Sequence, residues 1–383
     1  MSSSSRRLSR WLVAGVTAVA VAAVPSAAAA RVDAAGAATS ATARAAAVLP
    51  SWASDSDERK QLISYVKRVT KKGSSSYIPV KDRVAVFDQD GTIHVESPNE
   101  ALIGEVAVAV QRAEEVVREK GLGPGSSLYD NLATLKQQFI DDPRFKNTSA
   151  DALYAVMAEA FAGWTVEGYV NYVARFFRQR HPEKPITWAQ GFYRPMVELI
   201  QYLEDNQFTV YIVSASQREY LWGSAGKTLG LERWQMIGTD VQLGLSDPGT
   251  VVRGNRFAAF NYDEDKVFNI LRQVGKKPVL AFGNSSGDYP MMRYTMTNRY
   301  PTQAYLVVHD DGKREYEYDV ESRTNAARTN GWGVISMRSD FRTLWSTSTP
   351  SKGGKKNNSS TTGKRNAKGK GKAKAKAKAK AIA

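Results

Sequence analysis

The chain has 383 residues, enough for a complete domain with a second domain inserted into it. Its net charge of +15 suggests nucleic-acid binding. Residues 350–383 carry +12 and residues 1–50 carry +4, however, which leaves −1 for residues 51–349. The part that we expect to fold is therefore nearly neutral, and the basic charge lies at the two ends of the chain. The absence of cysteine excludes disulfides, thiolate nucleophiles and cysteine-ligated metal sites.

Residues 1–30 have the pattern of an export signal peptide. Three arginines within residues 6–10 precede an apolar run over residues 11–24, and small residues follow it. We expect cleavage near residues 28–30 and no stable transmembrane span afterwards, because the apolar run is short and rich in small residues. An uncleaved anchor is the alternative. The expected location is secreted or in the periplasm or cell envelope, with the Sec and twin-arginine routes both open.

The next segments differ sharply in their hydrophobic patterns. Residues 31–51 are Ala-rich without a period, which predicts a linker. Folded structure is expected from Trp52, with a helix over residues 57–69 and a buried strand over residues 83–87. Residues 99–189 then carry apolar residues at three- and four-residue spacing, which predicts an inserted all-helical domain.

Strands and helices alternate in the remainder of the folded chain. The predicted elements are a helix over residues 194–206, a strand over 208–214, a helix from 217, short strands within 235–260, a helix from 265, a strand over 278–282 and a helix from 288. This alternation predicts an α/β fold with a doubly wound, Rossmann-like parallel sheet, built from residues 52–98 and 190–349. Such sheets bind ligands at the carboxyl ends of their strands.

The first predicted strand ends in the sequence FDQDGT, which places Asp88 and Asp90 one residue apart. Gly91 permits the bend that would bring both carboxyl groups to one region. A carboxylate can attack phosphorus when a cation masks the repulsion, and a second carboxyl group can protonate the leaving oxygen and later activate water. A calcium loop would need a different spacing of acids and glycine. The alternative is an ordinary Asp-Gly turn that ends the strand.

Two further polar residues lie at predicted strand or helix ends. Ser216 and Glu219 form a capping-box pattern, which leaves Ser214 without a structural task and available to a phosphate oxygen. Lys266 lies in the first turn of a predicted helix, where a lysine is unfavourable against the helix dipole and would suit phosphate binding. For Ser214 a structural role, and for Lys266 a plain surface position, are the alternatives.

The sequence AFGNSSGD places Asn284 and Asp288 in a loop after another predicted strand. Oxygen ligands on such a turn suit Mg²⁺, which takes one or two carboxylates, waters and a substrate phosphate. Alternatively, Asp288 caps the next helix.

The order of these motifs resembles the haloacid dehalogenase-like (HAD) superfamily, on its phosphatase side. FDxDGT and GNSxGDxxM are most similar to exported, phosphoserine-phosphatase-like hydrolases, and the likeness extends from about Val84 to Trp345. The resemblance implies Mg²⁺ as cofactor and a helical cap over residues 99–189. It implies these roles: Asp88 as nucleophile, Asp90 as general acid/base, Gly91, Thr92, Ser214 and Lys266 as phosphate-binding residues, and Asp88, Asp90, Asn284 and Asp288 as the metal site.

The chain departs from many relatives at Asn284, where they carry aspartate. An amide oxygen can still coordinate a cation, but one negative charge is missing, so either Asn284 or Asp288 is left as the direct ligand. Displacing halide needs no leaving-group protonation, so the presence of Asp90 favours a phosphomonoester over a haloacid.

The cap is expected to select the substrate, a small phosphorylated metabolite. Tyr169 and Tyr172 lie on one stripe of a predicted helix and could cage a quaternary ammonium, although core packing is the more common role of such a stripe. Glu96, at the entry to the cap, could meet a substrate amine or have no role. His309, in a family-like HDD sequence, has no assigned mechanism and is expected in a structural turn.

Residues 350–383 form a Lys/Ala-rich tail that is disordered by composition. It could contact polyanions, with no chemistry for reading bases, or serve as a solubilising extension. Two functions are therefore in competition. The favoured one is an Mg²⁺-dependent phosphomonoesterase that uses an aspartyl-phosphate. Its rival is a non-catalytic HAD-fold protein held by its tail on nucleic acid or an anionic surface polymer.

Overall fold

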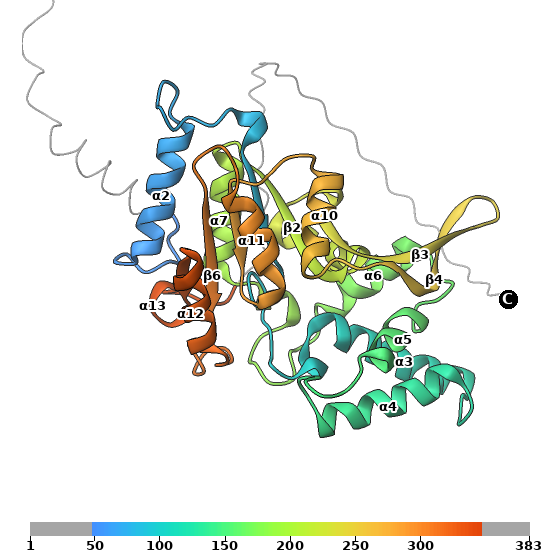
Figure 1. Cartoon of the computed structure of the whole chain (residues 1–383). Coiled ribbons are helices and arrows are strands. Elements are labelled where there is room, and N and C mark those ends of the chain that lie inside the picture. The colour runs from blue at the N-terminus through green and yellow to red at the C-terminus, as the bar shows by residue number, and fades with distance from the viewer. Residues whose placement is uncertain (1–47, 347–383) are drawn as a thin grey trace, which may run out of the picture.

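The computed structural model describes residues 48–346 (Figure 1). The predicted signal peptide, residues 31–47 of the linker and the basic tail lie outside the described residues. Within residues 48–346, no helix combines the length and apolar character needed to cross a bilayer. The folded part begins before Trp52, because Ser51 is buried and donates from its N–H and Oγ to the Glu198 carboxylate at 2.8 and 2.7 Å.

Seven strands form one sheet in the order β4-β3-β2-β1-β5-β6-β7. All neighbouring strands are parallel except β3 and β4, which form an antiparallel hairpin. The strand bounds are β1 Val84–Phe87, β2 Thr209–Gln217, β3 Met236–Ser246, β4 Thr250–Ala259, β5 Leu280–Gly283, β6 Gln303–Val308 and β7 Gly333–Ser336. Since β1 lies between β2 and β5, the carboxyl ends of these three strands meet at one edge.

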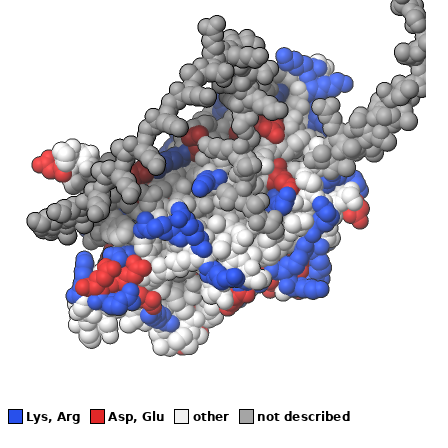
Figure 2. All heavy atoms as spheres, turned by 180° about the vertical axis from the view of Figure 1, so that it is seen from behind, with Lys and Arg blue, Asp and Glu red and all other residues white. Residues whose placement is uncertain are grey.

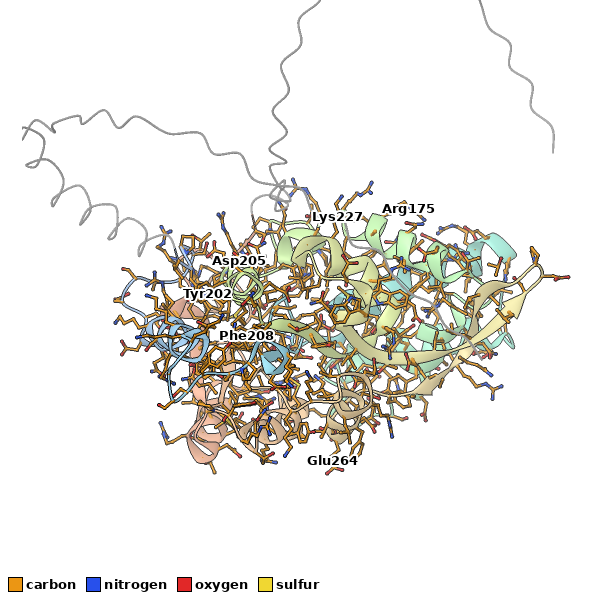
Figure 3. All side chains as sticks on the ribbon, turned by 90° about the horizontal axis from the view of Figure 1, so that it is seen from above. Arg175, Tyr202, Asp205, Phe208, Lys227 and Glu264 are labelled. Carbon is orange, nitrogen blue, oxygen red and sulfur yellow. The ribbon has the colours of Figure 1, made fainter. Side chains whose placement is uncertain are left out.

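Helices cover both faces of the sheet, as the sequence predicts. Along β1, Ala85 and Phe87 belong to one hydrophobic cluster and Val84 and Val86 to another, because successive side chains of a strand point to opposite faces. Helices α2 and α7 pack on the first face, and α10, α11 and α12 on the second. Figure 3 shows α7, labelled at Asp205, and α10, labelled at Glu264, on opposite sides of the strands.

The helix bounds are α2 Asp57–Thr70, α3 Gly104–Lys120, α4 Ser127–Asp141, α5 Asp151–Glu159, α6 Val166–Phe176, α7 Arg194–Asp205, α8 Arg218–Ser224, α9 Gly226–Leu229, α10 Glu264–Gln273, α11 Tyr289–Met296, α12 Val320–Asn330 and α13 Met337–Asp340. Short 3-10 helices are η1 Val80–Asp82, η2 Glu100–Leu102, η3 Trp188–Gly191, η4 Arg233–Gln235 and η5 Ser286–Asp288.

Helices α3 to α6 occupy the chain between β1 and α7, and the β3–β4 hairpin packs against α5 and α6 (Figure 1). The N–H of Gly163 donates to the Arg253 carbonyl, and the N–H of Arg253 to the Trp164 carbonyl, both at 2.8 Å. The buried guanidinium of Arg253 lies 3.8 Å from the Tyr169 ring centroid and donates to Glu219 at 3.0 Å. The hairpin is therefore fixed to the helical segment by both backbone and side-chain contacts.

The capping box predicted for Ser216 and Glu219 is wrong. Strand β2 continues to Gln217, the next helix begins at Arg218, and no side chain caps it. Glu219 is instead buried beside Arg253, and Ser216 is free to point into the site described below.

Charge is mixed on the outer surface. Figure 2 shows Lys and Arg interspersed with Asp and Glu over one face of the described residues, with no single-sign patch dominating it. This agrees with the net charge of −1 for residues 51–349, obtained by subtracting +12 for residues 350–383 and +4 for residues 1–50 from +15.

Candidate active site

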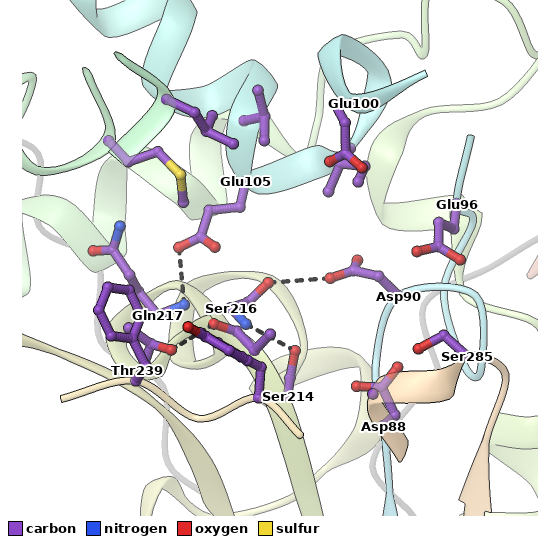
Figure 4. Close-up of a pocket in the computed structure, with 18 of the residues that line it drawn as sticks. Asp88, Asp90, Glu96, Glu100, Glu105, Ser214, Ser216, Gln217, Thr239 and Ser285 are labelled. Atoms are coloured by element: carbon purple, nitrogen blue, oxygen red, sulfur yellow. Dashed lines mark hydrogen bonds between the residues drawn. The ribbon is translucent and has the colours of Figure 1, made fainter. Parts of the chain in front are cut away.

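Strand β1 ends in the centre of the sheet, and Asp88 is the first residue beyond it. The N–H of Asp88 donates to the Phe282 carbonyl of β5 at 3.0 Å, so sheet pairing continues to this residue. Gly91 then has a φ of +72°, and its N–H donates to the His94 carbonyl at 2.8 Å. This tight loop brings Asp88 and Asp90 to the wall of one cavity (Figure 4).

Lys266 bridges two buried carboxylates. Its Nζ donates to Oδ1 of Asp88 and to Oδ1 of Asp288 at 2.7 Å each, and the residue is only 3% exposed. Burial alone would lower the pKa of Lys266, but the two carboxylates raise it overall. Burial and the nearby Asp288 raise the pKa of Asp88, while Lys266 opposes that rise. Lys266 is therefore a buried cation that orients Asp88, and the surface-lysine alternative is wrong.

The two predicted metal ligands in the loop after β5, Asn284 and Asp288, have different positions. Asn284 lines the cavity, whereas Asp288 does not. Oδ2 of Asp288 accepts from the N–H groups of Asn284 at 3.0 Å and Ser285 at 2.9 Å, and Oδ1 accepts from Lys266. Asp288 also completes a capping box with Ser285 at η5, which runs directly into α11, so the predicted capping role of Asp288 is present one turn earlier. Asp288 therefore holds the loop and Lys266 in place, and its position does not support the predicted direct contact with a metal ion.

Asp90 lies between a hydroxyl group and an imidazole ring. Its Oδ2 accepts from Ser216 Oγ at 3.1 Å, and its Oδ1 lies 3.8 Å from His94 Nδ1. Burial raises the pKa of Asp90 to about 6, and the Ser216 hydrogen bond opposes this. Burial lowers the pKa of His94 to about 4, and its Nε2 donates to the Trp188 carbonyl at 2.9 Å. A carboxyl group with a pKa near neutrality can both give and take a proton.

Of the predicted phosphate-binding residues, Ser214 and Lys266 line the cavity. Ser214 Oγ accepts from the N–H of Ser216 at 3.1 Å, which leaves its own hydroxyl hydrogen for another acceptor. The prediction is not supported for Gly91 and Thr92. Their N–H groups close the turn, and the buried Thr92 hydroxyl donates to Asn284 Oδ1 at 3.2 Å.

The cavity has a volume of about 320 Å³ and lies between the strand ends and the helical segment. The carboxyl groups of Glu96, Glu100 and Glu105 line the part of the cavity at the top of Figure 4. Burial raises the pKa of Glu100 to about 7 and that of Glu105 to about 8, and Glu105 accepts from the Gln217 N–H at 2.9 Å. The apolar part of the lining comprises Ile103, Val106, Leu153, Tyr154, Met157, Phe257, Phe260 and Tyr262.

Tyr169 and Tyr172 do not line this cavity. Tyr169 is 1% exposed and lies under the Arg253 guanidinium, while the Tyr172 hydroxyl donates to Glu115 at 2.9 Å. Both rings also contact Phe161 edge to face. Core packing therefore describes the position of both rings, which the structure does not bring to the cavity.

Glu96 does line the cavity, but its Oε2 is already engaged by Asn284 and Tyr318. Burial raises the pKa of Glu96, and the His309 charge and the Tyr318 hydrogen bond oppose this. This engagement was not predicted, because Glu96 and Asn284 are 188 residues apart in sequence.

His309, which had no assigned mechanism, supports the loop after Asp90. Its Nε2 lies 2.8 Å from the Gly91 carbonyl and its Nδ1 lies 3.0 Å from Glu315 Oε2. Burial opposes the charge, but Glu315 raises the pKa of His309 overall. Glu315 also accepts from the Glu96 N–H and the Tyr193 hydroxyl. The HDD sequence was a signal for this residue, but only the fold reveals its partners.

The site offers hard oxygen donors. Within residues 48–346, no group of three or more His, Cys, Asp or Glu side chains is arranged to hold a metal ion, so a cation here would also need amide or main-chain oxygens. Asp88 Oδ2 has only a 3.5 Å contact with Thr92 Oγ1 among the described residues, and Asn284 Oδ1 faces the same hydroxyl. This donor chemistry fits Mg²⁺, which needs few protein ligands.

Comparison with known proteins places this site in a family. The model of haloacid dehalogenase-like hydrolases matches residues 85–293, more than half of the chain. No curated protein matches the sequence.

Solved structures resemble the chain at low identity. A conserved protein of unknown function from Anaerococcus prevotii is 14% identical, with a TM-score of 0.48, over 75% of this chain and 94% of that one. A phosphoserine phosphohydrolase-like protein from Francisella tularensis is 14% identical, with a TM-score of 0.32, over 64% of this chain and 98% of that one. Cytosolic 5'-nucleotidase IIIB bound to cytidine is 10% identical, with a TM-score of 0.41, over 73% and 85%. On the match to the family model, the chain belongs to the haloacid dehalogenase-like hydrolases.

Proposed function

We propose that this protein is an Mg²⁺-dependent phosphomonoesterase that hydrolyses a small organic phosphate through a phosphorylated Asp88. The observation that carries the proposal is the convergence of Asp88, Asp90, Ser214 and Lys266 on one cavity at the strand ends. Asp88 is held by a buried lysine, and the pKa of Asp90 is raised to about 6.

In the first step, a carboxylate oxygen of Asp88 attacks phosphorus and the bond to the ester oxygen breaks. Asp90 gives its proton to the leaving alkoxide, and Ser214 and Lys266 bind non-bridging phosphate oxygens. In the second step, Asp90 takes a proton from water, which attacks phosphorus and releases inorganic phosphate and Asp88. Mg²⁺, when held by Asp88, the Asp90 main-chain carbonyl and Asn284, would offset the charge of the two anions.

Hydrolysis outside the cytoplasm is part of the same proposal, and it is supported by the signal-peptide pattern of residues 1–30. The rival non-catalytic role gains no support from the site, since a fold used only for attachment has no need of a lysine buried between two carboxylates.

Phosphate release from a panel of small phosphate esters, with and without Mg²⁺, tests the proposal in wild type and Asp88→Asn. We expect Mg²⁺-dependent release from the wild type and no turnover by the variant. The matched control is Asp82→Asn, because Asp82 precedes the opposite end of β1, does not line the cavity, and is half-buried with its Oδ2 accepting from the Tyr300 hydroxyl at 3.0 Å. Hydrolysis that persists undiminished in Asp88→Asn would refute the covalent mechanism.

A further inference from the structure

The orientation of the Asn284 side chain is fixed by its neighbours. Its Nδ2 lies 2.6 Å from Glu96 Oε2, and its Oδ1 accepts from Thr92 Oγ1 at 3.2 Å. Because a carboxylate can only accept hydrogen bonds, the amide nitrogen must face Glu96. The amide oxygen is therefore turned toward Thr92 and the neighbouring Asp88.

Glu96 is built into this arrangement. Its Oε2 accepts from both Asn284 Nδ2 and the Tyr318 hydroxyl, and the Tyr318 ring lies 4.4 Å from the His309 ring. Glu96 and Asn284 pack directly on the loop that carries Asp90. A Cβ atom at Gly91 would lie 1.9 Å from Asn284 Nδ2 and 2.2 Å from Glu96 Oε2. Glycine is thus required here both by its positive φ and by the space that the pair occupies.

We propose that Asn284 and Glu96 act as one unit in the metal site, in which Asn284 supplies a neutral oxygen to the cation and Glu96 supplies the negative charge one hydrogen bond behind it. This assignment rests on the proposed function. The carboxylate polarises the amide and makes Oδ1 a better donor, as outer hydrogen-bond partners do for other metal ligands. The negative charge that an aspartate at position 284 would carry is therefore supplied by Glu96, one hydrogen bond farther from the cation.

This arrangement couples the two positions. An aspartate at 284 would place a second carboxylate about where the amide now lies, at a 2.6 Å contact with Glu96, so two like charges would face each other in a buried site. Exchanging both residues, as Asn284→Asp with Glu96→Gln, keeps the total charge and reverses the direction of the hydrogen bond. The double variant should then be better than either single one.

The test measures Mg²⁺ binding by titration calorimetry and stability by thermal unfolding without metal, for wild type, E96Q, N284D and N284D/E96Q. We expect E96Q to weaken Mg²⁺ binding about 10- to 100-fold. N284D should lower the unfolding temperature of the metal-free protein, and the double variant should recover both the wild-type unfolding temperature and the wild-type affinity. E100Q is the matched control, because Glu100 lines the same cavity without contacting Asn284, and its affinity should change less than that of E96Q.

Failure of the Asn284–Glu96 pair can be distinguished from failure of the proposed cofactor. If the wild type binds no Mg²⁺, the cofactor of the proposed function and this assignment both fail. If the wild type binds Mg²⁺ but E96Q binds it equally well, only the pair is overturned. Effects of the two substitutions that simply add in the double variant would also overturn the pair, whatever the catalytic activity.

Discussion

Lys266→Met should destabilise the protein severely near neutral pH. Methionine is similar in length to lysine but leaves Asp88 and Asp288 without the cation that now lies 2.7 Å from each. Breaking a buried ion pair costs about 3–5 kcal/mol, and we expect the upper end because two carboxylates lose the same partner. Since a domain is typically stable by about 5–15 kcal/mol, this is a third or more of the free energy of unfolding.

The assay is urea unfolding of metal-free protein, followed by tryptophan fluorescence, at about pH 7 and about pH 5. Lys266 opposes the rise in the pKa of Asp88, so without it this pKa should rise further, and protonation of Asp88 at lower pH relieves the repulsion between the two carboxylates. The difference in free energy of unfolding between wild type and Lys266→Met should therefore shrink as the pH falls. Lys276→Met is the control, since this exposed lysine lies 3.7 Å from Asp82 and should contribute less than about 1 kcal/mol. Equal unfolding midpoints for Lys266→Met and Lys276→Met would refute the reasoning.

Three further predictions concern two residues of the cavity wall and the buried ion pair of the β3–β4 hairpin. Burial raises the pKa of Glu105 to about 8 from 4.5, so the folded state holds a proton that the unfolded state has lost, and stability falls as the pH rises between these values. Glu105→Gln lacks this penalty and should gain stability relative to wild type between about pH 5 and about pH 8 in urea unfolding; a constant difference would contradict the shift. Arg253→Met leaves the buried Glu219 unpaired and should cost about 3–5 kcal/mol in the same assay, with part of the loss recovered in Arg253→Met/Glu219→Leu. No recovery would show that the ion pair is not the cause. Ser216→Ala removes the donor to Asp90 and should lower kcat about 10- to 100-fold with little change in KM, as steady-state kinetics would measure. A rise in KM alone would place Ser216 in substrate binding instead.

Local patterns in the sequence predict local structure well. The apolar run before Asp88 identifies β1, and the spacing of apolar residues identifies α2 and the helices between β1 and β2. Lys266 lies in the first turn of α10, as predicted, where a lysine is unfavourable against the helix dipole. Strands β6 and β7 and helix α12 were covered by the family resemblance but not predicted from the pattern.

The parts that could not be predicted depend on contacts between distant segments. The capping-box interpretation of Ser216 failed because pairing with β3 extends β2 to Gln217, and a local pattern carries no information about pairing. Tyr169 is packed under Arg253, which is supplied by a hairpin that lies far along the chain. The same limit hid the contact between Glu96 and Asn284.

The central claim is that Asp88 is phosphorylated during turnover, and mass spectrometry of acid-quenched protein tests it most directly. Asp90→Asn is the suitable variant, with 4-nitrophenyl phosphate as substrate. The 4-nitrophenolate leaving group needs no proton, whereas hydrolysis of the intermediate still needs a base, so the phosphorylated protein should accumulate. The account predicts one added phosphoryl group on the peptide that contains Asp88, in the presence of Mg²⁺, and none in Asp88→Asn/Asp90→Asn. Two results would contradict the account if the wild type turns over this ester. One is the absence of a phosphoryl group on Asp88 in both quenched wild type and quenched Asp90→Asn. The other is a phosphoryl group on a different residue.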